Sequence, residues 1–164
     1  MNPYFSIIIP AYNEEKYIEK TLLSLQNQSY SDYEAIVVLN GCTDSTEKVV
    51  KKFKKLNIRY VVRPEAQVSQ ARNYGAELAH GKVLIFLDAD TQLLPDTLKR
   101  IKEEFTVEYA VATTLVLPDA TALKFRLAMN FKNNYNRLKW YEGCSGILVT
   151  WKKILMLFMD IILY

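Results

Sequence analysis

Short apolar runs alternate with segments of helical periodicity along the chain, and this alternation constrains the fold more than any other feature of the sequence. Phe5–Ile9 is an isoleucine-rich run closed by Pro10, which is typical of a strand buried on both faces of a parallel sheet. Further strands are expected at residues 35–39, 58–62, 83–87, 109–116 and 146–150. Because strands that alternate with helices form a mostly parallel sheet flanked by helices, we expect an α/β fold in a single domain.

Segments with apolar residues at helical spacing lie between the expected strands. Asn13 is placed to cap the first helix, in which apolar residues recur from Tyr17 to Leu25. The Asp44–Glu47 segment is a variant of the capping box and predicts a second helix with Leu56 on its inner face. Further helices are expected at residues 68–79, 95–105 and 120–139.

The charge, cysteine and histidine content narrows the class of protein. The 21 basic and 18 acidic residues leave a formal charge of +3, which is too small to indicate nucleic-acid binding. Cys42 and Cys144 belong to no C-x-x-C pair, so neither a disulfide framework nor a zinc site is expected. His80, the one histidine, is expected to cap a helix C-terminus beside Gly81. Residues 1–10 lack a basic leader, so we expect a cytoplasmic protein.

Three loops follow expected strands and should meet at one edge of the sheet, where ligands bind in open α/β folds. They contain residues 10–14, 40–44 and 88–91. Asp88 and Asp90 follow a buried strand with one residue between them, so both carboxylates can meet one hard cation, Mg²⁺ or Mn²⁺. The alternative is a solvated turn in which Asp90 begins a helical cap.

Neither of the familiar glycine-rich phosphate loops is present in the sequence. If a nucleotide binds at this edge, the charge of its diphosphate must therefore be met by a metal ion and basic residues. Arg72 is a candidate for this role, although an arginine on a helix is more often a solvated or ion-paired surface residue.

Four motifs, in this order along the chain, resemble the family 2 glycosyltransferases, which are inverting enzymes with the Rossmann-like GT-A fold. The motifs are Ile7–Glu15, Asn40–Thr46, Ala71–Gly75 and Phe86–Asp90. On this resemblance, residues 1–115 form the nucleotide-sugar-binding part of one domain and residues 116–164 form a partial acceptor-side part.

The resemblance also implies roles for individual residues. A UDP- or GDP-linked sugar would be the donor, a cation would bridge its diphosphate, and a glycan or lipid-linked acceptor would receive the sugar with inversion. Asp88 and Asp90 would bind the metal, and Asp88 would also approach the ribose. The residues implied in nucleotide-sugar binding are Pro10, Ala11, Tyr12, Glu14, Asn40, Arg72 and Asp88.

The chain departs from the family pattern at the catalytic base and at the turn after the second expected strand. The family's downstream Glu-Asp pair is missing, and the acids beyond residue 109 are Asp119, Glu142 and Asp160, none of which matches the base. A non-catalytic nucleotide-sugar-binding module therefore stays open. An active glycosyltransferase ranks first and this binding module second. A nucleotidyltransferase ranks third, because the glycine-rich basic first loop expected of that class is absent.

The turn after the second expected strand also departs from the family. Many members carry an aspartate where this chain has Leu39–Asn40, so the choice between a uridine and a guanosine nucleotide stays open.

The C-terminal segment Ile154–Tyr164 is apolar at every position except Asp160. Its eleven residues fall short of the roughly 20 needed to span a bilayer. We expect a buried element separated from its partners, with an interfacial segment as the alternative. On this reading the segment replaces or truncates the part that completes the acceptor site, and it predicts self-association. A basic surface that contacts the inner face of a membrane is the alternative to a solvated face for Lys48, Lys51, Lys52, Lys54 and Lys55.

Overall fold

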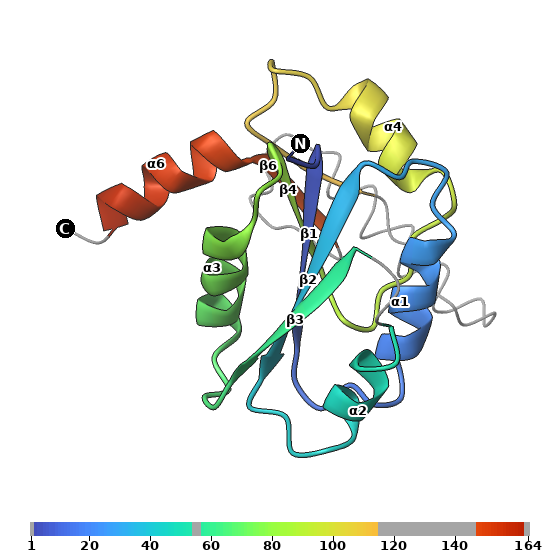
Figure 1. Cartoon of the computed structure of the whole chain (residues 1–164). Coiled ribbons are helices and arrows are strands. Elements are labelled where there is room, and N and C mark those ends of the chain that lie inside the picture. Colours follow the sequence, from blue (N-terminus) through green and yellow to red (C-terminus); the bar gives the residue numbers. More distant parts are fainter. Residues whose placement is uncertain (1, 54–56, 115–146, 163–164) are drawn as a thin grey trace, which may run out of the picture.

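The computed structural model describes residues 2–53, 57–114 and 147–162, with the backbone alone for 158–162. In it, a six-stranded sheet has the order β3-β2-β1-β4-β6-β5, and helices flank it on both sides (Figure 1). The strands are β1 Phe5–Ala11, β2 Tyr33–Asn40, β3 Ile58–Arg63, β4 Val83–Leu87, β5 Val111–Thr113 and β6 Ile147–Trp151. The helices are α1 Ile18–Gln26, α2 Thr46–Val50, α3 Val68–Leu78, α4 Thr97–Glu104 and α6 Lys152–Ile162. The expected α/β fold with a mostly parallel sheet is confirmed.

The four strands β1 to β4 are parallel to one another, with Ile7 opposite Ala35 of β2 and Ile85 of β4. β6 is antiparallel to β4 and lies between β4 and β5, with Phe86 opposite Leu148. Because the carboxyl ends of β1, β2 and β4 point the same way, their following loops meet at one edge, called here the carboxyl edge. The edge formed by the amino ends of the same strands is called the amino edge.

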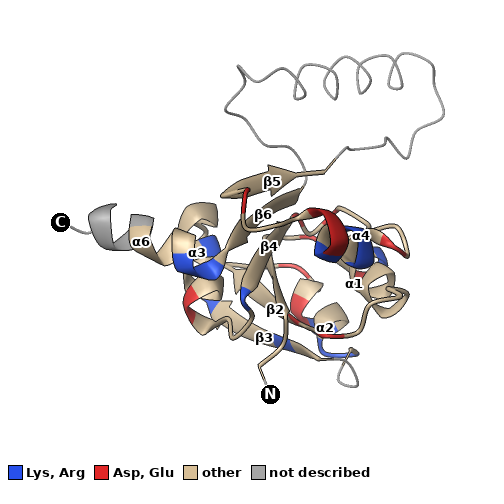
Figure 2. Ribbon diagram, turned by 90° about the horizontal axis from the view of Figure 1, so that it is seen from above, with Lys and Arg blue, Asp and Glu red and all other residues tan. Residues whose placement is uncertain are grey.

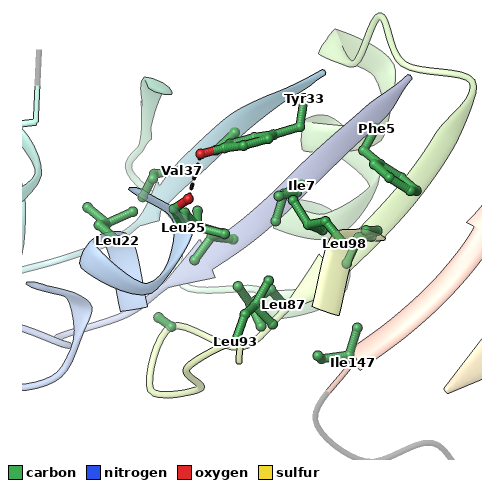
Figure 3. Close-up of a cluster of buried hydrophobic side chains, with 14 of the residues drawn as sticks. Phe5, Ile7, Leu22, Leu25, Tyr33, Val37, Leu87, Leu93, Leu98 and Ile147 are labelled. Carbon is green, nitrogen blue, oxygen red and sulfur yellow. Dashed lines mark hydrogen bonds between the residues drawn. The ribbon is translucent and has the colours of Figure 1, made fainter. Parts of the chain in front are cut away.

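Two hydrophobic layers hold the sheet, because the side chains of buried parallel strands are apolar on both faces. The helices α1, α2 and α4 cover one face, and α3 and the start of α6 cover the other (Figure 2). Figure 3 shows the larger cluster, in which the hydroxyl of Tyr33 donates a hydrogen bond to the carbonyl of Leu25 at 2.7 Å. That bond satisfies a phenol that is only 8% exposed and ties α1 to β2.

Several predicted boundaries differ from the structure. β1 continues through Pro10 to Ala11, which is tolerated because the pairing with β4 ends at Ile8. α2 ends at Val50 instead of including Leu56, which lies outside the described residues. β5 is confined to Val111–Thr113, shorter than the expected strand at 109–116. The expected helix at 120–139 also lies outside the described residues, as do Cys144, Asp119 and Glu142.

The cap predicted at Asn13 is wrong. Helix α1 begins at Ile18, with Tyr17 at its N-terminal boundary, and Asn13 lies in the preceding loop with a positive φ of 54°. Instead of capping the helix, the side chain of Asn13 accepts hydrogen bonds from the loop after β2, about 30 residues further along the chain.

The C-terminal apolar segment forms α6, which projects away from the sheet beyond α3 (Figure 1). Leu155 and Met156 pack against the smaller hydrophobic cluster, whereas Leu157 is 57% exposed. The first residues of the segment are therefore partly buried. Among the described helices, none has both the length and the apolar character required to cross a bilayer.

At the amino edge, Glu34 is held by groups from β1, from β3 and from the loop after α3. Its Oε1 accepts hydrogen bonds from the hydroxyl of Ser6 and the backbone N–H of His80, both at 2.6 Å, and its Oε2 lies 3.2 Å from Arg59. His80 faces Glu34, so its predicted role as a helix cap is wrong. Arg59 and Lys152 donate instead to the last carbonyls of α3, at Leu78 and Ala79.

Candidate functional site

The loops after β1 and β2 are joined to each other at the carboxyl edge. The Asn13 Oδ1 accepts from the backbone N–H of Thr43 at 2.8 Å and of Asp44 at 3.3 Å. In the reverse direction, the N–H of Glu14 donates to Thr46 Oγ1 at 2.7 Å. These reciprocal bonds tie the loop after β1 to the loop after β2 and to Thr46, the first residue of α2.

The loop after β4, which carries Asp88 and Asp90, is anchored by the buried polar face of α1. Thr21 is fully buried and donates to the carbonyl of Ala89 at 2.7 Å. Ser24, one turn later, accepts from the N–H of Leu93 at 3.0 Å. Because Ala89 lies between the two aspartates and is 4% exposed, the contact with Thr21 leaves both carboxylates on the outside of the loop.

Asp88 forms an ion pair with Arg72 of α3, at 3.0 Å between Asp88 Oδ1 and Arg72 Nη2. Both side chains are close to 40% exposed, so the pair lies at the surface of the edge. The Nε of Arg72 is buried without a hydrogen-bond partner among the described residues. α3 reaches this position because Gly75 packs on Ile8, where a Cβ would lie 2.5 Å from a methyl group of Ile8.

Negative charge gathers around Glu14. Burial raises the pKa of its carboxyl above the ordinary value of 4.5, and the charges of Asp90, Asp44 and Asp88 raise it further. For Asp44, by contrast, burial is outweighed by hydrogen bonds from Thr46 and from the N–H of Glu15, so its pKa is lowered. Four carboxylates thus lie at one edge, and burial together with the charges of the other three disfavours the ionised form of Glu14.

The structure brings most of the predicted site residues together at this edge. Tyr12 is 52% exposed, Pro10 is partly buried, and Asp90 is exposed. Ala11 is fully buried and its carbonyl accepts from the thiol of Cys42 at 3.2 Å, so its side chain belongs to the core. Asn40 is 3% exposed and its amide oxygen accepts from the N–H of Gln67 at 3.1 Å.

Asp88 and Asp90 carry carboxylate oxygens, the kind of ligand that Mg²⁺ and Mn²⁺ prefer. Within residues 2–53, 57–114 and 147–162, no group of three or more His, Cys, Asp or Glu side chains is arranged to hold a metal ion. The two aspartates can therefore supply only part of a coordination shell. The remaining ligands of a cation held there would come from a bound anion or from water.

Sequence reasoning missed the residues that hold the loops. Thr21 and Ser24 lie on the inner face of α1, where the helical pattern gives no sign that they bind a loop more than 60 residues away. Thr46 was predicted only as part of a capping box, and Asn13 only as a helix cap. Their role depends on tertiary contacts that no local pattern reports.

Comparison with known proteins gives a family and several relatives. The sequence model of the family described as "Glycosyl transferase family 2" matches residues 6–162. The glycosyltransferase AglE of Haloferax volcanii is 41% identical over 93 residues, which cover 54% of this chain and 31% of AglE. The chain thus spans about a third of the length of this relative.

Solved structures with the same architecture include the crystal structure of Staphylococcus aureus TarS 1–349 in complex with UDP-GlcNAc. It is 30% identical, with a TM-score of 0.61, and the match covers 74% of this chain and 37% of that one. The mannosyltransferase PcManGT of Pyrobaculum calidifontis, solved with GDP-Man and Mn²⁺, has a TM-score of 0.77 at 22% identity over 97% of this chain and 47% of its own. The second likeness concerns the fold, which is the predicted GT-A fold.

Proposed function

The chain belongs to glycosyl transferase family 2, and from this premise we propose that its carboxyl edge binds a UDP- or GDP-linked sugar together with Mg²⁺ or Mn²⁺. The bound sugar is then transferred to an acceptor hydroxyl with inversion. The donor side of the proposal rests on residues 5–97, whereas the acceptor side rests on family membership alone.

One observation carries the donor site: Asp88 and Asp90 are exposed on a loop whose backbone is anchored from below, with Arg72 3.0 Å from Asp88. An ion pair this exposed contributes little to stability, so its residues are free to serve a ligand. Glu14 and Asp44 add negative charge nearby, which attracts a cation to the edge.

In the proposed mechanism, Asp88 and Asp90 hold the cation and Arg72 contributes a second positive charge toward the diphosphate. When bound, Mg²⁺ or Mn²⁺ supplies the positive charge that stabilises the departing nucleoside diphosphate. Tyr12, which is half exposed beside the loop, offers an aromatic face to the base, and the fixed backbone at Pro10 and Ala11 forms the wall behind it. The loops thereby orient the anomeric carbon toward the acceptor.

Calorimetric titration tests the donor site. The 164-residue chain is titrated with UDP-sugars and GDP-sugars in the presence of Mn²⁺ and in the presence of chelator. We expect binding that requires the metal and that falls below detection in Asp90→Ala. Asp96→Ala is the matched control, because Asp96 is an exposed aspartate downstream of Asp90, at the start of α4, without a side-chain hydrogen bond there. Metal-dependent binding that survives in Asp90→Ala would refute the assignment.

A transfer assay separates an active enzyme from a module that only binds the donor. Inversion requires a carboxylate that deprotonates the acceptor hydroxyl. Asp160 lies on α6 and its side chain is not described, so we assign no base. Sugar transfer by the purified chain, lost in Asp90→Ala, would support the enzyme; donor binding without transfer would support the binding module.

For the acceptor side, we propose a glycan or lipid-linked acceptor and a contact between α6 and a membrane or a second copy of the chain. Lys153 is exposed and precedes an apolar segment in which Leu157 is also exposed, a combination suited to an anionic lipid surface. Co-sedimentation with anionic vesicles and size-exclusion chromatography, with and without residues 154–164, test the two contacts. An unchanged monomer that ignores vesicles in both forms would exclude them.

A further inference from the structure

The side chain of Asn40 is buried between the end of β2 and the segment that leads into α3. Its side-chain oxygen accepts a hydrogen bond from the backbone N–H of Gln67 at 3.1 Å, and the residue is only 3% exposed. Because a backbone N–H can donate only to the oxygen of the amide, the side-chain carbonyl of Asn40 points toward the segment that leads into α3.

The turn after Asn40 is shaped to receive the same segment. Gly41 has a positive φ of 73°, and its N–H donates to the carbonyl of Arg63 at 2.8 Å. A Cβ on Gly41 would lie 3.1 Å from the backbone nitrogen of Ala66, which is tighter than ordinary contact. The chain between β3 and α3 therefore lies directly on the Asn40–Gly41 turn.

Gln67 is the N-cap residue directly before α3, and its carbonyl accepts from the N–H of Ala71 at 2.9 Å. No side chain of the helix's own caps this end. Arg72 follows within the next turn and meets Asp88. The hydrogen bond from Gln67 to Asn40 thus fixes the start of the helix whose second turn reaches the donor edge.

We propose that Asn40 is a positioning residue: it anchors the N-terminus of α3 and, through that helix, holds Arg72 against Asp88, and it does not read the nucleotide base. The inference rests on the proposed donor site for its consequence in binding. It differs from the role that sequence resemblance implied for Asn40, which was contact with the nucleotide. The structural part of the inference, the anchoring of α3, is independent of any ligand.

Hydrogen–deuterium exchange of the full chain tests the anchoring without nucleotide. We expect Asn40→Ala to raise exchange about tenfold at the N–H of Gln67, which keeps only the carbonyl of Glu65 at 3.2 Å, and at the N–H of Ala71, which is bonded to Gln67. Asn40→Asp, which keeps an acceptor oxygen, should restore slow exchange. Asn57→Ala is the matched control, because Asn57 donates to the carbonyl of Tyr33 at the amino edge. Unchanged exchange at residues 67–72 in Asn40→Ala would overturn the proposal.

Nucleotide titrations then separate positioning from base reading. A positioning residue predicts that Asn40→Ala weakens UDP and GDP to the same degree, about tenfold, and adds almost nothing when Arg72→Ala is already present. A change in the ratio of the two affinities, or a full additional loss in the Arg72→Ala background, would overturn it. If the wild-type chain binds neither nucleotide, the proposed function fails while the exchange result still decides the anchoring.

Discussion

Glu14 and Glu34 lie at opposite edges of the same sheet and have opposite electrostatic surroundings. At the carboxyl edge, burial and the charges of Asp90, Asp44 and Asp88 raise the pKa of Glu14. At the amino edge, burial raises the pKa of Glu34, but hydrogen bonds from Ser6 and His80 and the charge of Arg59 outweigh burial and lower it. Among the described residues, the carboxylate of Glu34 has hydrogen-bond and ion-pair partners, and that of Glu14 has none.

The difference separates acids that serve the fold from acids that are available to a ligand. Ser6 is fully buried, and the N–H of Gly81 donates to its hydroxyl at 2.7 Å, so the network around Glu34 is closed on the backbone. The carboxyl edge is instead rigid in its backbone and unbalanced in its charge. Under the proposed function, an acidic edge with excess negative charge and a backbone held by hydrogen bonds would be preorganised for a cation.

The largest expected effect is on the amino edge. In Gly81→Ala the new Cβ would lie 2.5 Å from the nitrogen of Ser6 and 2.6 Å from the carbonyl carbon of Phe5. Because both are backbone atoms that the sheet holds in place, we expect a loss of about 3 kcal/mol in the free energy of unfolding, measured in urea. Gly41→Ala, at the carboxyl edge, should cost only about 1–2 kcal/mol for its positive φ. The reverse order would break the comparison.

Glu34→Ala should cost about 2 kcal/mol, because the hydroxyl of Ser6 and the N–H of His80 lose their acceptor and Arg59 loses its ion pair. The pH dependence gives a sharper test. A lowered pKa means that the stabilisation is fully present above the unfolded value of 4.5 and is lost as the pH falls through the folded pKa. Unfolding between pH 6 and pH 3 should show this loss in the wild type and a flatter curve in Glu34→Gln. Identical curves would contradict the role of Glu34.

Arg72→Ala should change the stability by less than about 1 kcal/mol, because its ion pair with Asp88 is exposed to solvent. Its affinity for a nucleoside diphosphate should nevertheless fall about tenfold, since a charge-assisted contact is lost. Arg100→Ala provides the control, as it removes an exposed pair with Glu104 on α4. A fall in stability without a fall in affinity would place Arg72 with the structural acids and bases.

The smallest effect is expected for Glu14→Gln. With a raised pKa, the ionised form of Glu14 is disfavoured by folding, so stability declines as the pH rises from 4.5 through the folded pKa. Glu14→Gln should remove this decline and be more stable at neutral pH by less than about 0.5 kcal/mol, because solvent screens the charges. Stability curves with and without Mn²⁺ test this, since a bound cation should abolish the decline in the wild type. A decline that persists in Glu14→Gln would assign it to another group.

The sequence was sufficient to predict the parallel strands and the loops at the carboxyl edge, because each apolar run is local and its polar end follows directly. It did not predict that β6 would be antiparallel and inserted between β4 and β5, since pairing between distant strands leaves no local pattern. The network of Ser6, Glu34, Arg59 and His80 was missed for the same reason. Asn13 was predicted to cap a helix, because an asparagine side chain can hydrogen-bond the N–H groups of a helix start as well as those of a neighbouring loop.

The comparison between the two edges is tested most directly by the thermal unfolding of the wild type, Asp90→Ala and Glu34→Gln, each with and without Mn²⁺ plus UDP or GDP. A ligand that binds the folded state alone raises the melting temperature, by an amount that grows with the logarithm of the ligand concentration divided by Kd. We predict a metal-dependent rise in the wild type and in Glu34→Gln, which starts from a lower melting temperature, and no rise in Asp90→Ala, which starts near the wild-type value. An equal rise in Asp90→Ala, or no rise in the wild type, would contradict the assignment of the carboxyl edge to a ligand.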